Sequence, residues 1–223
     1  MQKFLVAEKF ISINGEAKRA GELSVFIRFA GCNLRCNYCD TFWACDEAAA
    51  TELMSAEEIY QYIKASGVKN ITLTGGEPML QKDIKLLLDK LGEDRDLRTE
   101  IETNGAVSLD EYYKSVPENI SFTIDYKCPG SGMEHAMKLQ NFENIRSCDT
   151  VKFVVSDRND LDKMSEIVER YSLTEKCTVY VSAVFGRIEP REIVDHMVEK
   201  KMNDVRLQLQ IHKYVWDPQA RGV

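Results

Sequence analysis

Three of the seven cysteines in the chain lie close together, at Cys32, Cys36 and Cys39. Thiolates are soft ligands that suit zinc, copper and iron–sulfur clusters. A structural zinc site is normally closed by four ligands, and a fully ligated 4Fe–4S cluster also takes four cysteines. The next cysteine is Cys45, and the nearest histidine is His135. Three local thiolates therefore predict a 4Fe–4S cluster with one iron left open for a small molecule; the alternative is a zinc knuckle or an ordinary cysteine-rich loop.

A glycine-rich motif, Gly75-Gly76-Glu77-Pro78, follows the β-rich run of residues 70–74. A Gly-Gly pair alone predicts only a turn. Glycines also let the main chain approach a ligand closely, because no side chain intervenes. At a strand end and after a cysteine loop, the motif predicts a ligand-lining loop. We expect Glu77 to support this loop rather than to perform acid–base chemistry.

Polar side chains also end other predicted strands. They are Thr74, Glu102 and Asn104, the trio Asp125, Tyr126 and Lys127, and Ser182. Acidic, aromatic and basic groups together, as in the trio, can hold ribose hydroxyls, an adenine ring and a carboxylate. Asn104 is followed by glycine, a pair that by itself predicts only a turn.

Arg28 lies near the end of the predicted strand 24–29. Side chains alternate between the two faces of a strand, so Arg28 points away from the face that holds Ile27. An arginine in such an apolar strand needs an anionic partner. Two partners are open: a nearby carboxylate of the chain, or the carboxylate of a substrate.

The elements that position these residues alternate between strand and helix. Strands are expected at 4–13, 24–29, 70–74, 98–102, 121–125, 150–155, 177–182 and 205–211, and helices at 55–65, 80–91, 109–115, 160–171 and 191–202. The first helix opens on a capping box at Ser55 and Glu58 and ends at Gly67. Gly92 is the expected C′ residue of the second helix.

This alternation predicts an α/β fold with a parallel sheet and crossover helices. In such folds the site collects at the carboxyl ends of the strands, where these polar motifs lie. Seven strands after the opening one are too few for a closed eightfold barrel. We therefore expect an open, partial α/β barrel with a mostly parallel sheet. The turn at residues 12–16 carries Asn14 and Glu16, either as turn residues or as ligands.

The length of 223 residues fits one domain spanning 1–223, with a short N-terminal extension and a C-terminal tail. The net charge is −7 with no run of like charges, so nucleic acid is not an expected partner. We find no apolar run of membrane-spanning length and no signal-peptide core, and we expect a cytoplasmic protein. A reducing compartment also suits a thiolate-bound cluster. Cys148 and Cys177 are expected to be small core residues.

The cysteine spacing on a loop that leaves a strand, followed by Gly75-Gly76-Glu77-Pro78, resembles the radical S-adenosylmethionine (SAM) superfamily. Within it, the chain resembles the 7-carboxy-7-deazaguanine synthase family. Further motifs carry this resemblance almost from end to end: residues 12–16, the Asp40-Thr41 continuation, residues 102–105, residues 125–127, and the ending from residue 209 to 223. Asn14 departs from the pattern, because many relatives have glutamine there.

The resemblance implies the open partial (β/α) barrel of radical SAM enzymes. It also implies ring contraction of 6-carboxy-5,6,7,8-tetrahydropterin to 7-carboxy-7-deazaguanine with loss of ammonia, in queuosine-type deazapurine biosynthesis. The cofactors would be a 4Fe–4S cluster, SAM and Mg²⁺. The enzyme would be a homodimer and would receive electrons from a donor such as flavodoxin. In that superfamily SAM chelates the open iron through its amino and carboxylate groups, and its cleavage gives a 5′-deoxyadenosyl radical that would abstract hydrogen from the pterin.

The same resemblance implies roles for individual residues. Cluster ligands would be Cys32, Cys36 and Cys39, and Thr41 would bind Mg²⁺. SAM would contact Tyr38, Cys39, Asp40, Gly76, Glu77, Asp125, Tyr126, Lys127 and Ser182. The pterin would contact Ile13, Asn14, Gly15, Glu16, Arg28, Thr74, Glu102, Asn104, His212 and Val223, the last through its main-chain carboxylate.

Two other classes of protein share part of this pattern. A glycyl-radical enzyme activase has the cysteine triplet and a similar size, but the Asp40-Thr41 continuation and the ending favour the synthase. A non-enzymatic iron–sulfur carrier or zinc module needs neither an open iron nor a glycine-rich ligand loop.

Overall fold

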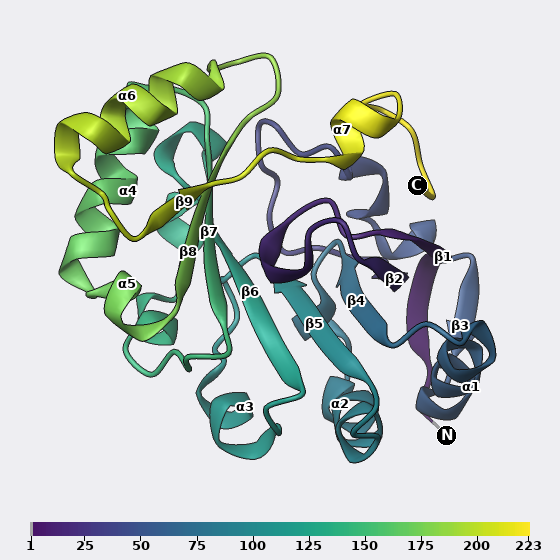
Figure 1. The fold of residues 1–223 in the computed structure, drawn as a ribbon. Helices are drawn as coiled ribbons and strands as arrows, with labels where there is room; N and C mark the ends of the chain where they lie inside the picture. The colour runs from purple at the N-terminus through teal and green to yellow at the C-terminus, as the bar shows by residue number, and fades with distance from the viewer. Residues whose placement is uncertain (1) are drawn as a thin grey trace.

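Every strand of the computed structural model, which describes residues 2–223, joins one sheet of order β3-β1-β2-β4-β5-β6-β7-β8-β9 (Figure 1). The strands are β1 Phe4–Ile13, β2 Leu23–Phe29, β3 Glu52–Met54, β4 Asn70–Gly75, β5 Arg98–Thr103, β6 Ile120–Tyr126, β7 Thr150–Val155, β8 Thr178–Ala183 and β9 Val205–Leu207. From β2 to β9 all neighbours are parallel, and β1 is antiparallel to both β2 and β3. The sheet is open, as expected.

Two strand predictions need correction. The three-residue strand β3 was not predicted, and β9 ends at Leu207 instead of residue 211. The main chain of Gln208 still donates to β8, but its side chain bonds both main-chain groups of Ala17, donating to the carbonyl at 3.0 Å and accepting from the N–H at 2.6 Å. The final strand therefore stops because its next side chain binds the N-terminal turn.

Helices connect the parallel strands. They are α1 Ala56–Ser66, α2 Ile84–Glu93, α3 Asp110–Ser115, α4 Arg158–Arg170, α5 Leu173–Lys176, α6 Pro190–Lys200 and α7 His212–Val215, with 3₁₀ turns at Ala17–Arg19, Phe42–Ala44, Glu47–Ala49, Pro78–Leu80, Pro129–Ser131, Glu134–Ala136 and Leu139–Phe142. The α1 capping box and the left-handed Gly67 cap are confirmed. The short helices α5 and α7 were not predicted.

The second helix differs from its prediction at both ends. Asp83 has a positive φ of 57°, which separates a 3₁₀ turn from α2 and delays the start of the helix. Gly92 lies inside α2 rather than after it. A Cβ on Gly92 would lie 2.8 Å from Cγ of Pro117, so close packing rather than helix termination requires this glycine.

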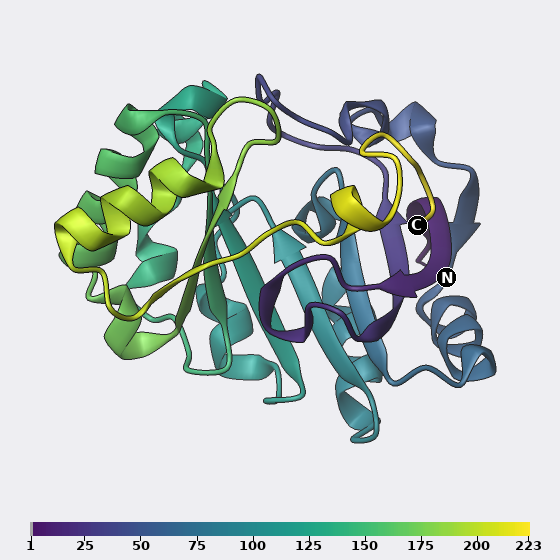
Figure 2. The same cartoon turned by 45° about the horizontal axis from the view of Figure 1, so that its top comes forward.

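The two faces of the sheet have different compositions because side chains alternate along each strand. The outer face is apolar, packs against the helices, and includes Ile27, Leu73, Ile101, Ile124, Phe153 and Val181, all fully buried. The inner face is mostly polar and includes Ser24, Arg28, Thr72, Thr74, Glu100, Glu102, Thr123, Asp125, Lys152 and Ser182. In Figure 2 the helices surround the outer face, and the N-terminal turn and the C-terminal segment cross the open side of the sheet. None of the helices in the described part of the chain has the length and apolarity that a membrane crossing requires.

Candidate functional site

The cysteine loop leaves the end of β2 and is joined by its main chain to the following segment. Gly31 N–H donates to Ala44 at 2.9 Å, and Cys32 N–H donates to Cys45 at 3.0 Å. The N–H of Gly76 donates to the carbonyl of Phe29, and a Cβ there would lie only 2.1 Å from the oxygen of Gly31. Gly76 must therefore be glycine so that the end of β4 can contact the cysteine loop.

The thiols of Cys32, Cys36 and Cys39 are free and partly exposed. Two N–H groups approach Sγ of Cys32: the main chain of Leu34 at 3.4 Å and Nδ2 of Asn104 at 3.7 Å. Such donors stabilise a thiolate. Burial raises the pKa of Cys36, and Lys127 partly opposes this shift, so deprotonation there would need the help of a bound metal.

These three cysteines fit an iron–sulfur cluster better than a single ion. Within residues 2–223, no three His, Cys, Asp or Glu side chains converge as a single-ion site requires. A four-iron cube binds each thiolate at a different iron, so its cysteines need not converge on one point. The N–H donors at Cys32 match the hydrogen bonds to sulfur that tune such clusters.

A buried carboxylate supports the far side of the cysteine loop. Asp160, fully buried at the start of α4, accepts hydrogen bonds from the N–H of Gly130 and of Ser156, both at 2.8 Å. The loop so fixed binds Asn37: the carbonyl of Ser131 accepts its N–H at 3.0 Å. Asp160 thus positions the loop that carries Cys36 and Cys39. The sequence analysis missed it, because its partners lie in other loops.

Glu77 has the geometry of a supporting residue, as expected. Its fully buried carboxylate accepts hydrogen bonds from the N–H of Met79 at 3.0 Å, the hydroxyl of Thr103 at 2.8 Å and the N–H of Asn104 at 2.7 Å. Burial raises its pKa, and these donors oppose the shift. Asn104 in turn donates to Asn33 Oδ1 at 2.8 Å, which joins the end of β5 to the cysteine loop.

Two partly buried ion pairs occupy the inner face. Lys127 contacts Asp125 at 2.8 Å, and Lys152 contacts Glu16 at 2.8 Å. Burial alone would lower the pKa of both lysines, but the neighbouring carboxylates outweigh it and raise both values. Ser182 donates to Glu16 at 3.4 Å. The ion pairs and this hydrogen bond involve four predicted site residues, Glu16, Asp125, Lys127 and Ser182. Lys152, which lies mid-strand, was missed.

Glu100 is a third ionisable group that the sequence analysis missed. It is buried on the inner face, two residues before Glu102 on β5, and accepts a hydrogen bond from the hydroxyl of Thr123. Burial, aided by the charge of Glu102, raises its pKa to about 7.

Tyr126 requires a correction. Because side chains alternate, Asp125 and Lys127 point to the inner face and the ring of Tyr126 points to the outer face. The ring is 2% exposed, packs at 5.4 Å from the ring of Phe153, and donates its hydroxyl to Glu134 at 2.9 Å. Its side chain therefore belongs to the helix-covered core and is not available to stack on an adenine ring.

Arg28 has a protein partner. Its Nε donates to Glu8 at 2.7 Å, across the β1–β2 pair. Of the two partners left open by the sequence, the structure contains the nearby carboxylate. Arg28 also lies beside Thr74 in the β2–β4 register, so both residues predicted to bind substrate share one end of the inner face.

The N-terminal turn and α7 contact each other although they are far apart in sequence. Ile211 N–H donates to Gly15 at 3.0 Å, and a Cβ on Gly15 would lie 2.0 Å from Nδ1 of His212. Asn14 is 3% exposed; its Oδ1 accepts from Thr72 at 2.7 Å, while its Nδ2 is buried without a partner among residues 2–223. A free buried donor here is suited to an acceptor on a bound ligand.

Asp40 and Thr41 follow the last cysteine. Thr41 Oγ1 donates to Asp40 at 3.1 Å, and Lys213 of α7 contacts the same carboxylate at 3.0 Å. Partial burial would raise the pKa of Asp40, but the Lys213 ammonium outweighs it and lowers the value to about 2.

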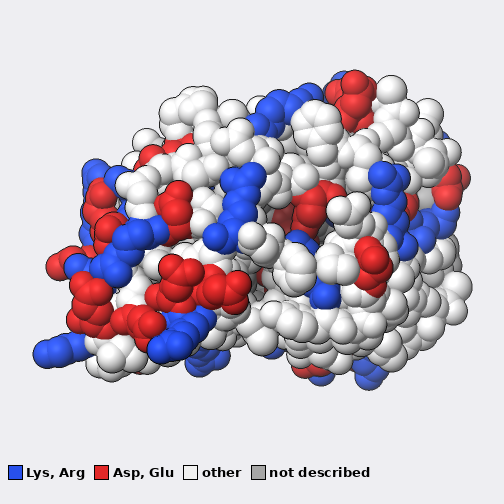
Figure 3. All heavy atoms as spheres, turned by 90° about the horizontal axis from the view of Figure 1, so that it is seen from above, with Lys and Arg blue, Asp and Glu red and all other residues white. Residues whose placement is uncertain are grey.

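Tyr38, just before Cys39, donates its hydroxyl to the carbonyl of Val154 at 3.1 Å. Figure 3 views this end of the molecule, where side chains of both charges are interspersed with uncharged surface.

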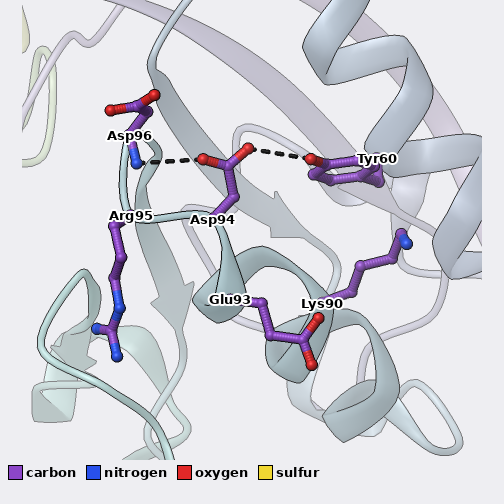
Figure 4. A pocket seen from close by; sticks show the side chains of 6 residues that line it. All are labelled: Tyr60, Lys90, Glu93, Asp94, Arg95 and Asp96. Carbon is purple, nitrogen blue, oxygen red and sulfur yellow. Dashed lines mark hydrogen bonds between the residues drawn. The ribbon is translucent and has the colours of Figure 1, made fainter.

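Two surface cavities lie apart from the inner face. One, of about 480 Å³, lies between α1 and the end of α2 with the residues that follow it. Figure 4 shows that its Asp94 is already paired with the hydroxyl of Tyr60 and with the N–H of Asp96. A second, of about 520 Å³, borders Cys32 and Cys45 on the outside of the cysteine loop.

Comparison with known proteins gives consistent results. The model of the radical SAM superfamily matches residues 26–126. The 7-carboxy-7-deazaguanine synthase of Clostridium acetobutylicum is 54% identical over 222 residues, covering 99% of each chain. The enzyme of that name from Leptospira interrogans is 34% identical, covering 99% of this chain and 98% of its own. The crystal structure of QueE from Escherichia coli has a similar fold, with a TM-score of 0.73 over 93% of both chains at 20% identity. The chain therefore belongs to the 7-carboxy-7-deazaguanine synthase family of radical SAM enzymes.

Proposed function

We propose that this chain converts 6-carboxy-5,6,7,8-tetrahydropterin to 7-carboxy-7-deazaguanine with loss of ammonia, as a step in queuosine-type deazapurine biosynthesis. The observation that carries the proposal is the end-to-end similarity to the synthase of Clostridium acetobutylicum. The polar inner face of the sheet, with the cysteine loop at its carboxyl end, supplies a site of the required chemistry.

Cys32, Cys36 and Cys39 would hold the 4Fe–4S cluster, leaving one iron for SAM. When bound, the cluster and SAM supply the radical that abstracts hydrogen from the substrate. SAM would lie along the cysteine loop and the inner face, near Tyr38, Asp40, Gly76, Glu77, Asp125, Lys127 and Ser182. Asp125 supports this placement, because its Oδ1 is buried without a partner among the described residues and can accept from a ligand hydroxyl.

The pterin would contact the N-terminal turn and the neighbouring strand ends, through Ile13, Asn14, Gly15, Glu16, Arg28, Thr74, Glu102, Asn104, His212 and the main-chain carboxylate of Val223. A guanidine-like ring edge presents parallel N–H donors, which carboxylates accept in fork geometry. The free Nδ2 of Asn14 supports its assignment as a donor to the substrate. Although it is one methylene shorter than glutamine, Asn14 is held by Thr72 with that nitrogen free.

Thr41 would contribute one hard oxygen ligand to Mg²⁺, with substrate and water supplying the others. We further propose a cytoplasmic homodimer that receives electrons from a donor such as flavodoxin. A reducing compartment keeps the cluster thiols free of disulfides. Ile11, Leu23 and Leu53, exposed apolar side chains on β1, β2 and β3, are available for contact between two copies.

Two measurements test the proposal against its rivals. Electron paramagnetic resonance of the reduced, anaerobic protein should show a 4Fe–4S signal that changes when SAM is added, whereas a zinc module gives no signal and a carrier with a closed cluster gives one that SAM leaves unchanged. Incubation with the pterin, SAM and dithionite should then yield 7-carboxy-7-deazaguanine by mass spectrometry. A SAM-dependent signal without this product would favour the glycyl-radical activase.

A further inference from the structure

Residues 211–223, which we name the C-terminal strap, are joined to the segment after the cysteines by two cationic side chains. Lys213 contacts Asp40 at 3.0 Å, and the guanidinium of Arg221 lies 4.4 Å from the ring centre of Trp43. These contacts flank Thr41, one on each side in sequence. The strap therefore touches segment 40–43 at two points. Lys213 is 173 residues from Asp40 in the sequence, and Arg221 is 178 residues from Trp43.

The strap is anchored independently of that segment. On one side its Ile211 is bonded to Gly15, and the absence of a Cβ on Gly15 makes room for the ring of His212. On the other side Tyr214 packs edge-on against Phe185 in the connection from β8 to α6, with ring centres 6.4 Å apart. The strap is thus held by the N-terminal turn and by the connection from β8 to α6. Its contacts link both of these segments to segment 40–43.

Segment 40–43 has few contacts of its own. The carboxylate of Asp40 has two partners in the structure, Lys213 and the neighbouring Thr41, and the ring of Phe42 is 60% exposed. Trp43 packs against a small cluster that includes Ala7, and Arg221 covers its ring. The Lys213 side chain is 10% exposed and the Asp40 side chain is 58% exposed, so this ion pair is open to solvent on the Asp40 side.

We propose that Lys213 and Arg221 are positioning residues, which fix the Asp40–Trp43 segment against the C-terminal strap. Closure of the strap over the bound pterin and ordering of the segment that contacts SAM then occur together. This inference rests on the proposed function, which places SAM at Asp40 and the pterin at the strap. Coupling between two sites is reciprocal, because a ligand that favours one arrangement is bound more tightly by it. SAM should therefore order the strap, and the strap should tighten SAM binding.

The test uses the reconstituted enzyme under anaerobic conditions. Lys213→Met keeps most of the aliphatic stem and removes the charge; Lys85→Met, which breaks the exposed pair between Lys85 and Asp89 on α2, is the matched control. We expect Lys213→Met to speed amide hydrogen exchange in residues 40–44 and to weaken equilibrium SAM binding by about five-fold or more, the low end of typical coupling. SAM should slow exchange in residues 211–221 of the parent enzyme, and Lys85→Met should change neither quantity.

A second variant keeps the proposal testable if Lys213→Met folds poorly. Arg221 is exposed, so Arg221→Gln should not threaten folding. In a Trp216→Phe background the remaining tryptophan, Trp43, should become more accessible to acrylamide quenching when Arg221 is changed. Unchanged exchange in residues 40–44, or unchanged quenching of Trp43, would overturn the proposal. Because exchange and quenching require no turnover, their outcome stays separate from that of the pterin reaction.

Discussion

The two faces of the sheet have different roles: the outer face stabilises the fold, and the inner face carries the polar groups of the site. Along β6, Phe122 and Ile124 point outward and are fully buried under helices, whereas Thr123 and Asp125 point inward among charged groups. The main chain is common to both sets, and only the alternation of side chains divides them. Changes on the outer face should therefore cost stability, and changes on the inner face or its loops should cost chemistry.

The largest effect on chemistry is expected from the cysteine loop, which closes the carboxyl end of the inner face. Changing Cys32 to alanine should remove the brown chromophore of the cluster and all turnover of the pterin, because the cysteine triplet then keeps only two of its three ligands. Iron content and product formation check this. Cys148→Ser serves as the control and should keep both; full activity of the Cys32 variant would refute the ligand assignment.

The outer face should show the opposite pattern. Phe153 is fully buried and packs on Tyr126, so Phe153→Ala should destabilise the protein by about 3–5 kcal/mol through lost burial and the cavity left behind. Denaturant unfolding measures this loss. Turnover per bound cluster should remain close to that of the parent at low temperature. A folded Phe153 variant that binds the cluster but has no turnover would show that the faces are not independent.

Glu100 is an inner-face group that should affect stability as well. Its folded pKa of about 7 lies above the ordinary value of 4.5, so the folded state binds this proton more tightly than the unfolded state does. The contribution of protonated Glu100 to the free energy of unfolding is fully present below about pH 4.5. It is lost as the pH rises towards 7, by up to about 3 kcal/mol. Glu100→Gln, which stays neutral, should flatten that part of the curve of unfolding free energy against pH. An unchanged slope would mean that Glu100 is charged in the folded protein.

Arg28 should show the smallest of these effects. Arg28→Lys keeps the charge and the pairing with Glu8 but loses the planar fork. If Arg28 also binds the substrate carboxylate, the loss of about 1.5–3 kcal/mol should appear as a roughly ten-fold or greater rise in KM for the pterin. SAM binding should stay constant. Equal losses for both ligands would make Arg28 a structural partner of Glu8 alone.

The sequence predicts the core strands well because their alternation and the loops at their ends repeat along the chain. It fails where position depends on distant partners. Lys152 and Glu100 look like ordinary strand residues until the sheet places them beside Glu16 and Thr123. Asp160 binds loops and Lys213 binds Asp40 across 173 residues, and no local pattern records either contact.

Local chemistry also misleads when geometry is ignored. Tyr126 lies between two inner-face residues in sequence, but the alternation of the strand turns its ring into the core. Gly92 resembles a helix terminator, whereas the close approach of Pro117 is what requires glycine there. In both cases the residue type suggests one role and its neighbours in space impose another.

Two adjacent residues of β5 allow the most direct test of the division between the faces. Ile101 is fully buried on the outer face and Glu102 points to the inner face. The measurement is 7-carboxy-7-deazaguanine formed per bound cluster, quantified by mass spectrometry, with unfolding followed on the same samples. We predict that Glu102→Gln loses at least about a hundred-fold in product, as an interaction of about 2.7 kcal/mol would give, with nearly unchanged stability. Ile101→Val should keep its product yield and lose about 0.5–1.5 kcal/mol of stability. Equal losses of product in both variants, or a Glu102 variant that retains full yield, would contradict the account.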